Sequence, residues 1–273
     1  MTRIMRVVGV HGVGNHRPSA TSTQAGEQLS AIWGRALARG FPGPVDLCVA
    51  YYADHLQPGG RQGADDDLPP EARELLEAWL AQLDLPPGVT QGNATRPFRQ
   101  IIGWIAERRQ LAPRLVELFV TTFFREVARY LGGDGVRQAS RDAVAATIRT
   151  HQPSVVLAHS LGSVVTYETL WHHPDLEVDL LVTLGSPLAM PHAVFPRLDP
   201  APVAGLGCRP PNVRRWVNIA DVGDLVAIPA GGVPTRFVDV AADHTAAIHA
   251  FDFHLVANYL ACPPLAAELS AHR

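Results

Sequence analysis

Short apolar runs without alternation between apolar and polar residues recur along the chain, and they constrain its fold more than any other feature. Strands of this kind are expected in a parallel sheet, because helices cover both of its faces. We therefore expect an α/β fold with a mostly parallel sheet of about six strands covered by helices. The predicted strands are residues 4–10, 45–52, 154–158, 178–184, 213–220 and 236–240.

Apolar residues at helical spacing predict the helices between these strands. The first pattern runs from Thr21 to Leu37, and Ser22 or Thr23 is available as its N-cap. The later patterns cover residues 71–83, 112–131, 136–150 and 163–172, and residues 253–260 are expected to form part of a closing helix.

Residues 54–110 interrupt this rhythm, because clusters of proline, glycine and aspartate are spaced through them. We expect a single domain, residues 1–273, in which 54–110 is a helical insertion that caps the site. The aromatic residues of this region and of the two following helices are open to three interpretations. They could line an apolar pocket for an acyl or alcohol group, form a face that opens toward lipid, or pack on the sheet as a helical core. For residues 112–150 we favour the core. The aromatic residues in question are Trp79, Phe98, Trp104, Phe119, Phe123 and Phe124.

Composition and charge exclude several classes of protein. A content of 47% hydrophobic and 18% charged residues is typical of a globular protein and excludes a disordered tail or a fibrous repeat. The net charge is −3 and no run of basic residues is present, so nucleic acid is not an expected partner. No segment resembles a signal peptide or is long enough to span a bilayer. We therefore expect a cytoplasmic protein with no integral membrane segment. The oligomeric state stays open.

The cysteines and histidines form no metal-binding pattern. Cys48, Cys208 and Cys262 lie far apart, and their odd number favours free thiols in a reducing compartment. The twelve histidines include no HExxH motif, and the adjacent His172 and His173 lie at a predicted helix end that is typical of a solvated surface. We therefore expect neither a metal ion nor another cofactor.

The segment Ala158–Gly162, with the sequence Ala-His-Ser-Leu-Gly, lies between a predicted strand and a predicted helix. In a strand-to-helix elbow the central serine, here Ser160, occupies a strained turn that raises its hydroxyl above the edge of the sheet. Small residues are needed at 158 and 162, and the backbone N–H of Leu161 can stabilise an oxyanion. The alternative is that Ser160 is only a helix N-cap. The flanking strand and helix favour the nucleophile.

Residues 155–163 resemble the nucleophile elbow of the α/β-hydrolase family, in its branch of bacterial lipases and esterases. The turn His11–Gly14 resembles the oxyanion loop of that family, and Leu184–Pro187 resembles the segment after its next strand. Two features depart from the pattern: Ala158 replaces the commoner glycine, and the chain begins at the strand that usually comes third, which implies a trimmed sheet with an intact catalytic edge. The resemblance implies an α/β-hydrolase fold and a serine hydrolase.

A serine hydroxyl needs a base within hydrogen-bond reach, held in place by a third group. In this family the order along the chain is serine, acid, histidine. Asp221 and Asp224 both follow a predicted strand, and the segment that begins with Asp224 resembles the Asp-Pro-Val turn of the family. Asp224 is therefore favoured as the acid, although either carboxylate could instead form an Asx turn or a helix cap.

Among the histidines that follow the predicted strands, His244, His249 and His254 are the candidates for the base, and at most one of them is expected to act as it. His254 is favoured, because residues 254–260 resemble the His-x4-Tyr-Leu opening of the last helix in bacterial hydrolases of this type. His244 and His249 remain alternatives.

The second oxyanion donor is expected to be the backbone N–H of Val13, since its glycine neighbours let the main chain approach the substrate. The alternative is that this segment is only a glycine-rich turn, and no lysine follows with the spacing of a phosphate loop. We expect His11, Gly12 and His159 to contact the substrate. A role of His11 in ordering the loop is the alternative for that residue.

Together these residues predict a serine hydrolase that cleaves a carboxylic ester, such as a small-molecule ester or a lipid, through a Ser160-His254-Asp224 triad and an acyl-enzyme intermediate. An acyltransferase, a thioesterase or a peptidase would use the same triad. A hydrolase fold that serves only as an interaction module is the alternative without catalysis.

Overall fold

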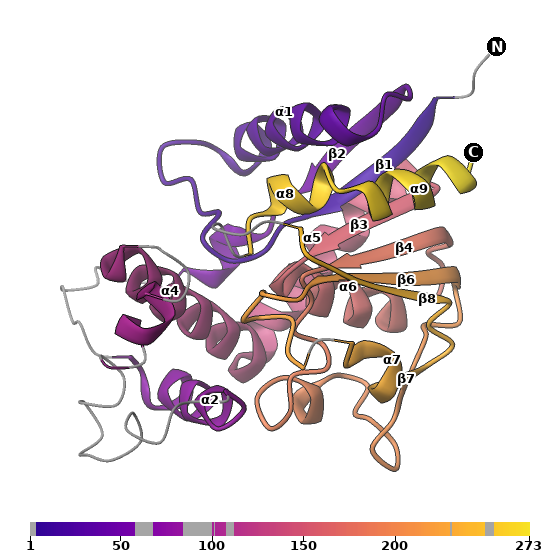
Figure 1. Ribbon diagram of the computed structural model, residues 1–273. Coiled ribbons are helices and arrows are strands. Elements are labelled where there is room, and N and C mark those ends of the chain that lie inside the picture. Colours follow the sequence, from indigo (N-terminus) through magenta and orange to yellow (C-terminus); the bar gives the residue numbers. More distant parts are fainter. Residues whose placement is uncertain are drawn as a thin grey trace.

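A six-stranded parallel sheet forms the centre of the computed structural model (Figure 1). The structure describes residues 4–57, 68–83, 100, 102–107, 112–229, 231–248 and 254–273. The strand order is β2-β1-β3-β4-β6-β8, and all five neighbouring pairs are parallel. These strands are β1 (Met5–Val10), β2 (Val45–Ala50), β3 (Val155–His159), β4 (Val178–Leu184), β6 (Val213–Asp221) and β8 (Ala242–Ala246). The predicted sheet, its strand number and its parallel pairing are confirmed.

Helices pack on both faces of this sheet, which explains why its strands are continuously apolar. Successive residues of a strand point to opposite faces, so Val7 and Val8 join different hydrophobic cores. One face is covered by α1 (Ser22–Gly40), α8 (Val256–Leu260) and α9 (Pro263–Ala271), and the other chiefly by α5 (Asp134–His151) and α6 (Leu161–His172) (Figure 1).

The sixth strand of the sheet is not the one that the sequence predicts. Residues 236–240 contribute only β7 (Phe237–Val238), which pairs with β5 (Gly207–Cys208) in a separate two-stranded sheet. The edge position belongs to β8, whose five residues are mostly half-buried. A half-buried edge strand does not need an apolar run, and β8, with its central Asp-His-Thr, has none.

Two further helix predictions need correction. Helix α1 is capped by Thr21 rather than by Ser22 or Thr23: the hydroxyl of Thr21 accepts from the backbone N–H of Gln24, and the side chain of Gln24 accepts from the backbone N–H of Thr21. The closing helix is followed by α9, which the sequence analysis does not predict.

The described parts of the segment between β2 and β3 are mainly helical. It contains the 3-10 turn η1 (Ala53–Leu56), then α2 (Pro70–Leu80), α4 (Pro113–Gly132) and α5. Helix α4 packs between α2 and α5, and α5 packs on α6 and on strands β1 and β2. The sheet-packed core favoured for residues 112–150 therefore describes α5 well. Phe98 and much of 54–110 lie outside the described residues, so the cap remains a prediction.

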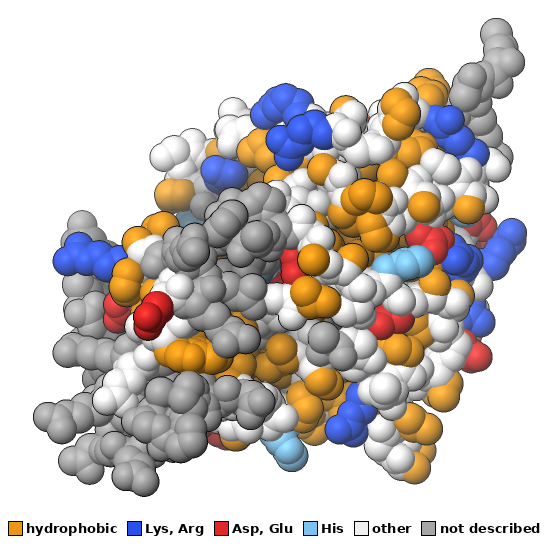
Figure 2. Space-filling view, viewed as in Figure 1, with side chains coloured by type: hydrophobic (Ala, Val, Ile, Leu, Met, Phe, Trp, Pro, Cys, Tyr) orange, Lys and Arg blue, Asp and Glu red, His pale blue; other side chains and the backbone are white. Residues whose placement is uncertain are grey.

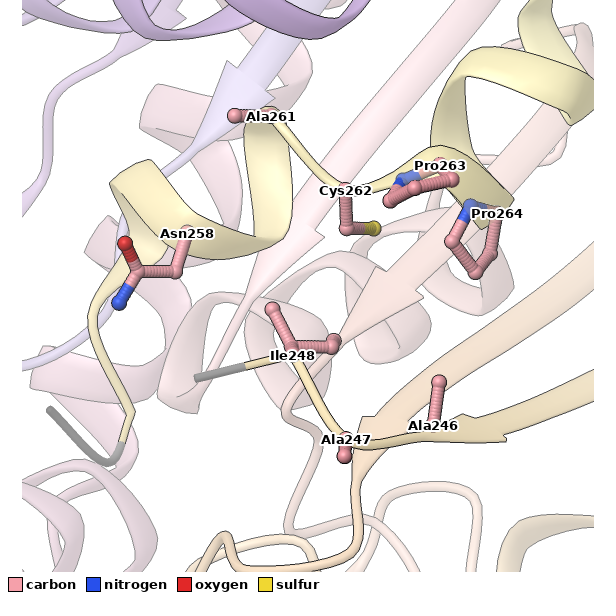
Figure 3. A pocket seen from close by; sticks show the side chains of 8 residues that line it. All are labelled: Ala246, Ala247, Ile248, Asn258, Ala261, Cys262, Pro263 and Pro264. Carbon is pink, nitrogen blue, oxygen red and sulfur yellow. The ribbon is translucent and has the colours of Figure 1, made fainter. Parts of the chain in front are cut away.

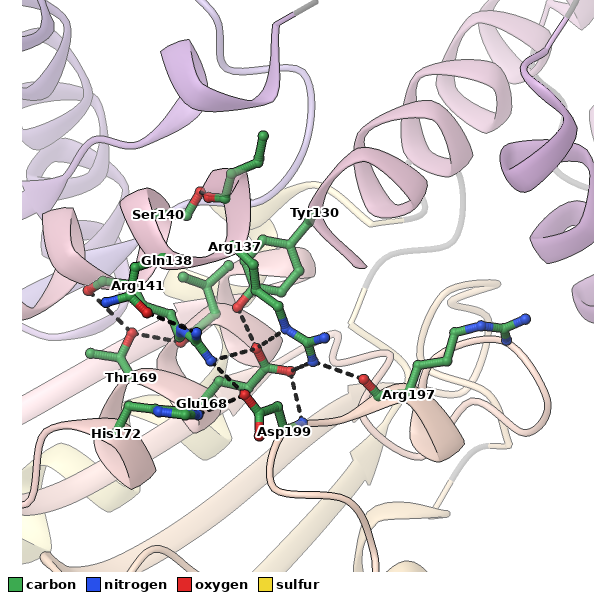
Figure 4. Close-up of polar contacts among 12 residues, drawn as sticks. Tyr130, Arg137, Gln138, Ser140, Arg141, Glu168, Thr169, His172, Arg197 and Asp199 are labelled. Atoms are coloured by element: carbon green, nitrogen blue, oxygen red, sulfur yellow. Dashed lines mark hydrogen bonds and ion pairs between the residues drawn. The ribbon is translucent and has the colours of Figure 1, made fainter. Parts of the chain in front are cut away.

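A buried ion-pair network fixes α6, the helix that follows Ser160 (Figure 4). The carboxylate of Glu168 accepts hydrogen bonds from the hydroxyl of Tyr130 at 2.6 Å and from the Nε of Arg137 at 2.8 Å. The backbone N–H of Asp199 donates to the same carboxylate at 3.2 Å. Asp199 in turn pairs with Arg141 at 2.8 Å. One carboxylate thus connects α6 to α4, to α5 and to the loop after η2 (Phe195–Arg197).

Candidate active site

Ser160 lies between β3 and α6 in a backbone conformation that non-glycine residues rarely adopt, with φ of 55° and ψ of −132°. The turn is tight: a Cβ atom at position 162 would lie 2.4 Å from the carbonyl oxygens of Val10 and His11. Glycine is therefore required there, as expected for an elbow. The backbone N–H of Ser160 donates to the carbonyl of Leu184 at 3.0 Å, which ties the turn to β4.

His254 and Asp224 lie next to this serine, although they are far from it in sequence. The Nε2 atom of His254 is 2.6 Å from the Oγ of Ser160, and its Nδ1 is 2.7 Å from the Oδ2 of Asp224. Ser160 follows β3 and Asp224 follows β6, so both lie at the edge of the sheet where the carboxyl ends of the parallel strands meet. His254 reaches the same edge from the segment before α8. The three residues favoured from the sequence form one hydrogen-bonded chain.

The alternative residues have other partners. Asp221 accepts hydrogen bonds from the backbone N–H groups of Gly223 at 2.8 Å and of Ile248 at 3.1 Å, so its carboxylate orders the surrounding loops. The Nε2 of His244 pairs with Glu268 at 2.7 Å. His249, the third histidine, lies outside the described residues.

Asp224 is buried, and both oxygens of its carboxylate accept hydrogen bonds. Its Oδ1 accepts from the backbone N–H of Val226 at 2.8 Å, and its Oδ2 accepts from the hydroxyl of Tyr259 at 2.6 Å as well as from His254. Burial opposes ionisation, but the charge of His254 and these hydrogen bonds hold the pKa of Asp224 below its ordinary value. Gly185 leaves the space that the carboxylate of Asp224 occupies, because a Cβ atom at position 185 would lie 2.7 Å from its Oδ2.

Tyr259 is a further residue of the site, and it contacts the acid. Its hydroxyl donates to Asp224 and accepts from the backbone N–H of Asp221 at 3.0 Å, so it fixes the acid against the end of β6. Its position in the stretch that begins at His254 was the available signal.

The loop after β1 passes close to the elbow. A Cβ atom at Gly12 would lie 2.5 Å from the Cβ of Ser160, so only glycine fits. The side chain of Asn15 donates to the carbonyls of Gly12 and Val13, both at 3.0 Å. Leu161, on the other side of the serine, is the first residue of α6, so its N–H has no acceptor within the helix.

His11 is held inside the protein by its neighbours. Its Nδ1 is 2.8 Å from the carbonyl of Gly12, and its Nε2 accepts from the backbone N–H of Tyr52 at 3.3 Å. The rings of His11 and Tyr52 stack with centroids 4.3 Å apart. Burial lowers the pKa of His11 to about 4, so the imidazole is neutral near pH 7. The geometry is that of a residue that orders the loop.

His159 lies against the triad. Its ring centroid is 4.6 Å from that of His254 and 5.7 Å from that of Tyr259. Burial, followed by the charge of His254, holds its pKa well below the ordinary value. Within the described part of the chain, its buried Nε2 has no hydrogen-bond partner.

Helix α4 covers the site. The rings of Phe119 and Phe123 have centroids 5.4 Å and 6.4 Å from the imidazole of His254, both in edge-on orientation. Ser160 itself has no exposed surface. On the outside of α4, Leu115 and Leu118 are more than half exposed.

A pocket of about 440 Å³ lies beside α8 and α9, and none of the three triad residues lines it (Figure 3). It is lined by Ala246, Ala247, Ile248, Asn258, Ala261, Cys262, Pro263 and Pro264.

Neither a metal centre nor a membrane span is found in the part of the chain that the structure describes. No three histidine, cysteine or acidic side chains converge there on a common point that could hold an ion. None of the described helices combines the length and the apolar character needed to cross a bilayer. On the face drawn in Figure 2, basic side chains are scattered rather than gathered in one patch.

Comparison with known proteins gives a likeness in three dimensions but none in sequence. No protein-family model matches the chain, and no curated protein matches it in sequence. Among solved structures, the chain is similar to an esterase from Pyrobaculum calidifontis, with 16% sequence identity and a TM-score of 0.37. The likeness covers 99% of this chain and 77% of the esterase. The strand order, the parallel pairing and the covering helices are those of an α/β-hydrolase fold.

Proposed function

We propose that this protein is a serine hydrolase that cleaves a carboxylic ester through an acyl-enzyme intermediate. The observation that carries the proposal is the hydrogen-bonded chain from Ser160 through His254 to Asp224, with the serine on a strained strand-to-helix turn. Nucleophile, base and orienting acid are the three parts that acyl transfer requires. The α/β-hydrolase fold is consistent with this reaction, and the proposal rests on the side chains of the site rather than on the fold.

In the first half of the reaction, Oγ of Ser160 attacks the ester carbonyl while Nε2 of His254 takes the hydroxyl proton. Asp224 holds Nδ1–H of His254 and stabilises the imidazolium that forms. The N–H groups of Leu161 and Val13 bind the oxyanion of the tetrahedral intermediate, and loss of one such donor costs about 2.7–4 kcal/mol of transition-state stabilisation. The intermediate collapses when the alkoxide leaves with the proton from His254.

In the second half, water attacks the acyl-enzyme and gives its proton to His254. The second tetrahedral intermediate releases the carboxylic acid and returns the proton to Ser160, so the enzyme is regenerated.

The surroundings of the triad support an apolar substrate. Phe119 and Phe123 lie over His254, so α4 serves as the cover of a site for the acyl or alcohol group. Gly12 and His159 are our candidates for substrate contact, the latter because its buried Nε2 has no partner among the described residues. We assign His11 to loop order, because both of its ring nitrogens are engaged by the backbone.

A fluorophosphonate probe tests the proposal. We expect the folded wild type to be labelled and Ser160→Ala to be unlabelled. Ser270→Ala is the matched control, because this serine lies exposed on α9 and should not affect labelling. Absence of labelling in the folded wild type would favour an interaction module.

The base and the substrate are tested separately. We expect His254→Ala to lose hydrolysis of p-nitrophenyl esters and His244→Ala to retain it. Full activity of His254→Ala would overturn the assignment. A series of esters with increasing acyl length would define the acyl pocket, and product analysis with added alcohol would separate hydrolysis from acyl transfer.

A further inference from the structure

Glu126, on α4, is a buried carboxyl group that the proposed reaction does not use. Its Oε2 accepts a hydrogen bond from the backbone N–H of Gly14 at 3.1 Å, across 112 positions of sequence. Burial raises the pKa of Glu126 to about 7, although the bond from Gly14 acts in the opposite direction. A buried ionisable group is costly, so the backbone N–H that donates to it points to its role.

The partner of Glu126 belongs to the loop that we propose to carry an oxyanion donor. The carbonyl of Val13 and the N–H of Gly14 are the two polar ends of one peptide plane. Asn15 holds the carbonyl end, and Glu126 holds the N–H end. Gly14 has φ of 72°, a conformation that makes this orientation accessible to glycine.

The amide of Val13 is left available by this arrangement. The side chain of Asn15 also occupies the carbonyl of Gly12, so the hydrogen-bonding groups on either side of that amide are engaged. Within the described residues, the N–H of Val13 itself has no acceptor. Gly12 brings this part of the loop against Ser160.

We propose that Glu126 is a positioning residue: by holding the Val13–Gly14 peptide, it aims the N–H of Val13 at the oxyanion that forms on the substrate of Ser160. The inference rests on the serine-hydrolase reaction proposed above. A donor fixed in advance needs no reorganisation when charge develops, which is why its orientation affects the transition state more than the bound substrate. The same helix carries Phe119 and Phe123, so α4 connects the cover of the site to the oxyanion loop.

A pair of substitutions of similar volume isolates the hydrogen bond. Glu126→Met removes the acceptor, whereas Glu126→Gln retains a carbonyl oxygen for Gly14. With p-nitrophenyl butyrate, we expect Glu126→Met to lose about tenfold or more in kcat with KM changed less than threefold, and Glu126→Gln to retain most of the wild-type kcat. Glu117→Met, an exposed change on the same helix, is the control and should leave both constants unchanged.

Two kinetic results would overturn the inference: a wild-type kcat in Glu126→Met, or an equal loss in both Glu126 variants. If the wild type itself neither hydrolyses esters nor reacts with the probe, the proposed function fails. If the wild type and Glu126→Met both hydrolyse esters at the same rate, the proposed function stands and only the role of Glu126 fails.

A measurement without turnover covers the case in which Glu126→Met does not fold. In protein labelled with 15N-glycine, the amide signal of Gly14 should shift with pH around 7 in the wild type, as Glu126 ionises, and should stay constant in Glu126→Gln. Tyr52 also interacts electrostatically with Glu126, and burial raises the pKa of Tyr52 well above this range. A Gly14 signal that is independent of pH in the wild type would overturn the inference.

Discussion

Two side chains share the acid of the proposed triad, because His254 and Tyr259 both donate to Oδ2 of Asp224. A hydrogen bond to the ionised carboxylate makes it less basic. The hydroxyl of Tyr259 therefore moderates how strongly Asp224 favours the protonated form of His254.

Tyr259→Phe should move the acidic limb of the kcat/KM profile to higher pH. Without the hydroxyl, Asp224 accepts one hydrogen bond fewer, so its charge stabilises the imidazolium that forms at His254 more strongly. The pH–rate profile of ester hydrolysis measures the shift.

Tyr130→Phe is the matched control for this change. Its hydroxyl also donates to a buried carboxylate, that of Glu168, but far from the reacting atoms. Both variants should lose about 1.5–3 kcal/mol of unfolding free energy, since each removes a hydrogen bond to a charged group. Equal pH profiles for both would contradict the role assigned to Tyr259.

Gly162→Ala should strongly destabilise the protein, because the new Cβ would meet the carbonyl oxygens of Val10 and His11 at 2.4 Å. We expect a loss of more than about 2 kcal/mol, measured by urea unfolding. Gly34→Ala is the matched change in a helix with free space around the glycine, and it should stabilise by roughly 0.5–1 kcal/mol. Equal stability of Gly162→Ala and Gly34→Ala would contradict the tightness of the elbow.

Site residues that are marked by the strands and turns next to them in sequence could be predicted from the sequence. Ser160 stands between a strand and a helix, and Asp224 follows a strand, so turn signals select them. Glu126 gave no such signal, because its partner Gly14 lies 112 positions away and only the packing of α4 brings them together. The nitrogen of His159 that lacks a partner among the described residues is likewise a property of the folded site.

At the scale of elements, apolar periodicity located the strands and helices that are buried, and it failed where burial is partial. Strand β8 lies at the edge of the sheet and carries a polar centre, so it has no apolar run to detect. Residues 236–240, with the sequence Arg-Phe-Val-Asp-Val, instead place Phe237 in a core formed with other elements. Tertiary position, which the sequence does not encode locally, decides such cases.

The Glu168 network connects α6, the helix after the nucleophile, to α4, α5 and the loop after η2, and its loss should destabilise all of them together. Glu168→Gln would leave Arg137 without its bidentate partner in a buried setting, so we expect a loss of about 3–5 kcal/mol in urea unfolding. Asp175→Asn, which breaks an exposed ion pair with Arg149, should leave the stability unchanged. Similar urea midpoints for the two variants would argue against a structural role of the network.

At the scale of the whole molecule, buried histidines connect stability to pH. The pKa of His11 is about 4 in the folded protein, whereas an unperturbed histidine has a pKa of 6.5, so the folded form binds fewer protons between these values. The stabilisation by neutral His11 is present above pH 6.5 and is lost as pH falls toward 4. It amounts to about 3 kcal/mol. Glu126 acts in the opposite sense, because its raised pKa favours folding below about 4.5 and loses that effect as pH rises through 7.

His11→Gln should therefore change how stability depends on pH. The difference in unfolding free energy between the wild type and this variant should widen as pH rises from 4.5 to 7. Urea titrations at several pH values measure this difference. His55→Gln, at an exposed position, should show a constant difference over the same range. A constant difference for His11→Gln would show that its ring is not kept neutral by burial.

Because Ser160 is completely buried, no reagent can reach its hydroxyl until the protein opens transiently. A reagent in solution must arrive while the protein fluctuates into a form that admits it, however reactive the hydroxyl is. Labelling should then rise with probe concentration only until the frequency of these fluctuations becomes limiting, after which the observed rate stays constant. Stopped-flow labelling at increasing probe concentration would reveal the plateau, and its height would give that frequency. A rate that remained proportional to concentration throughout would mean that the passage to Ser160 is never limiting.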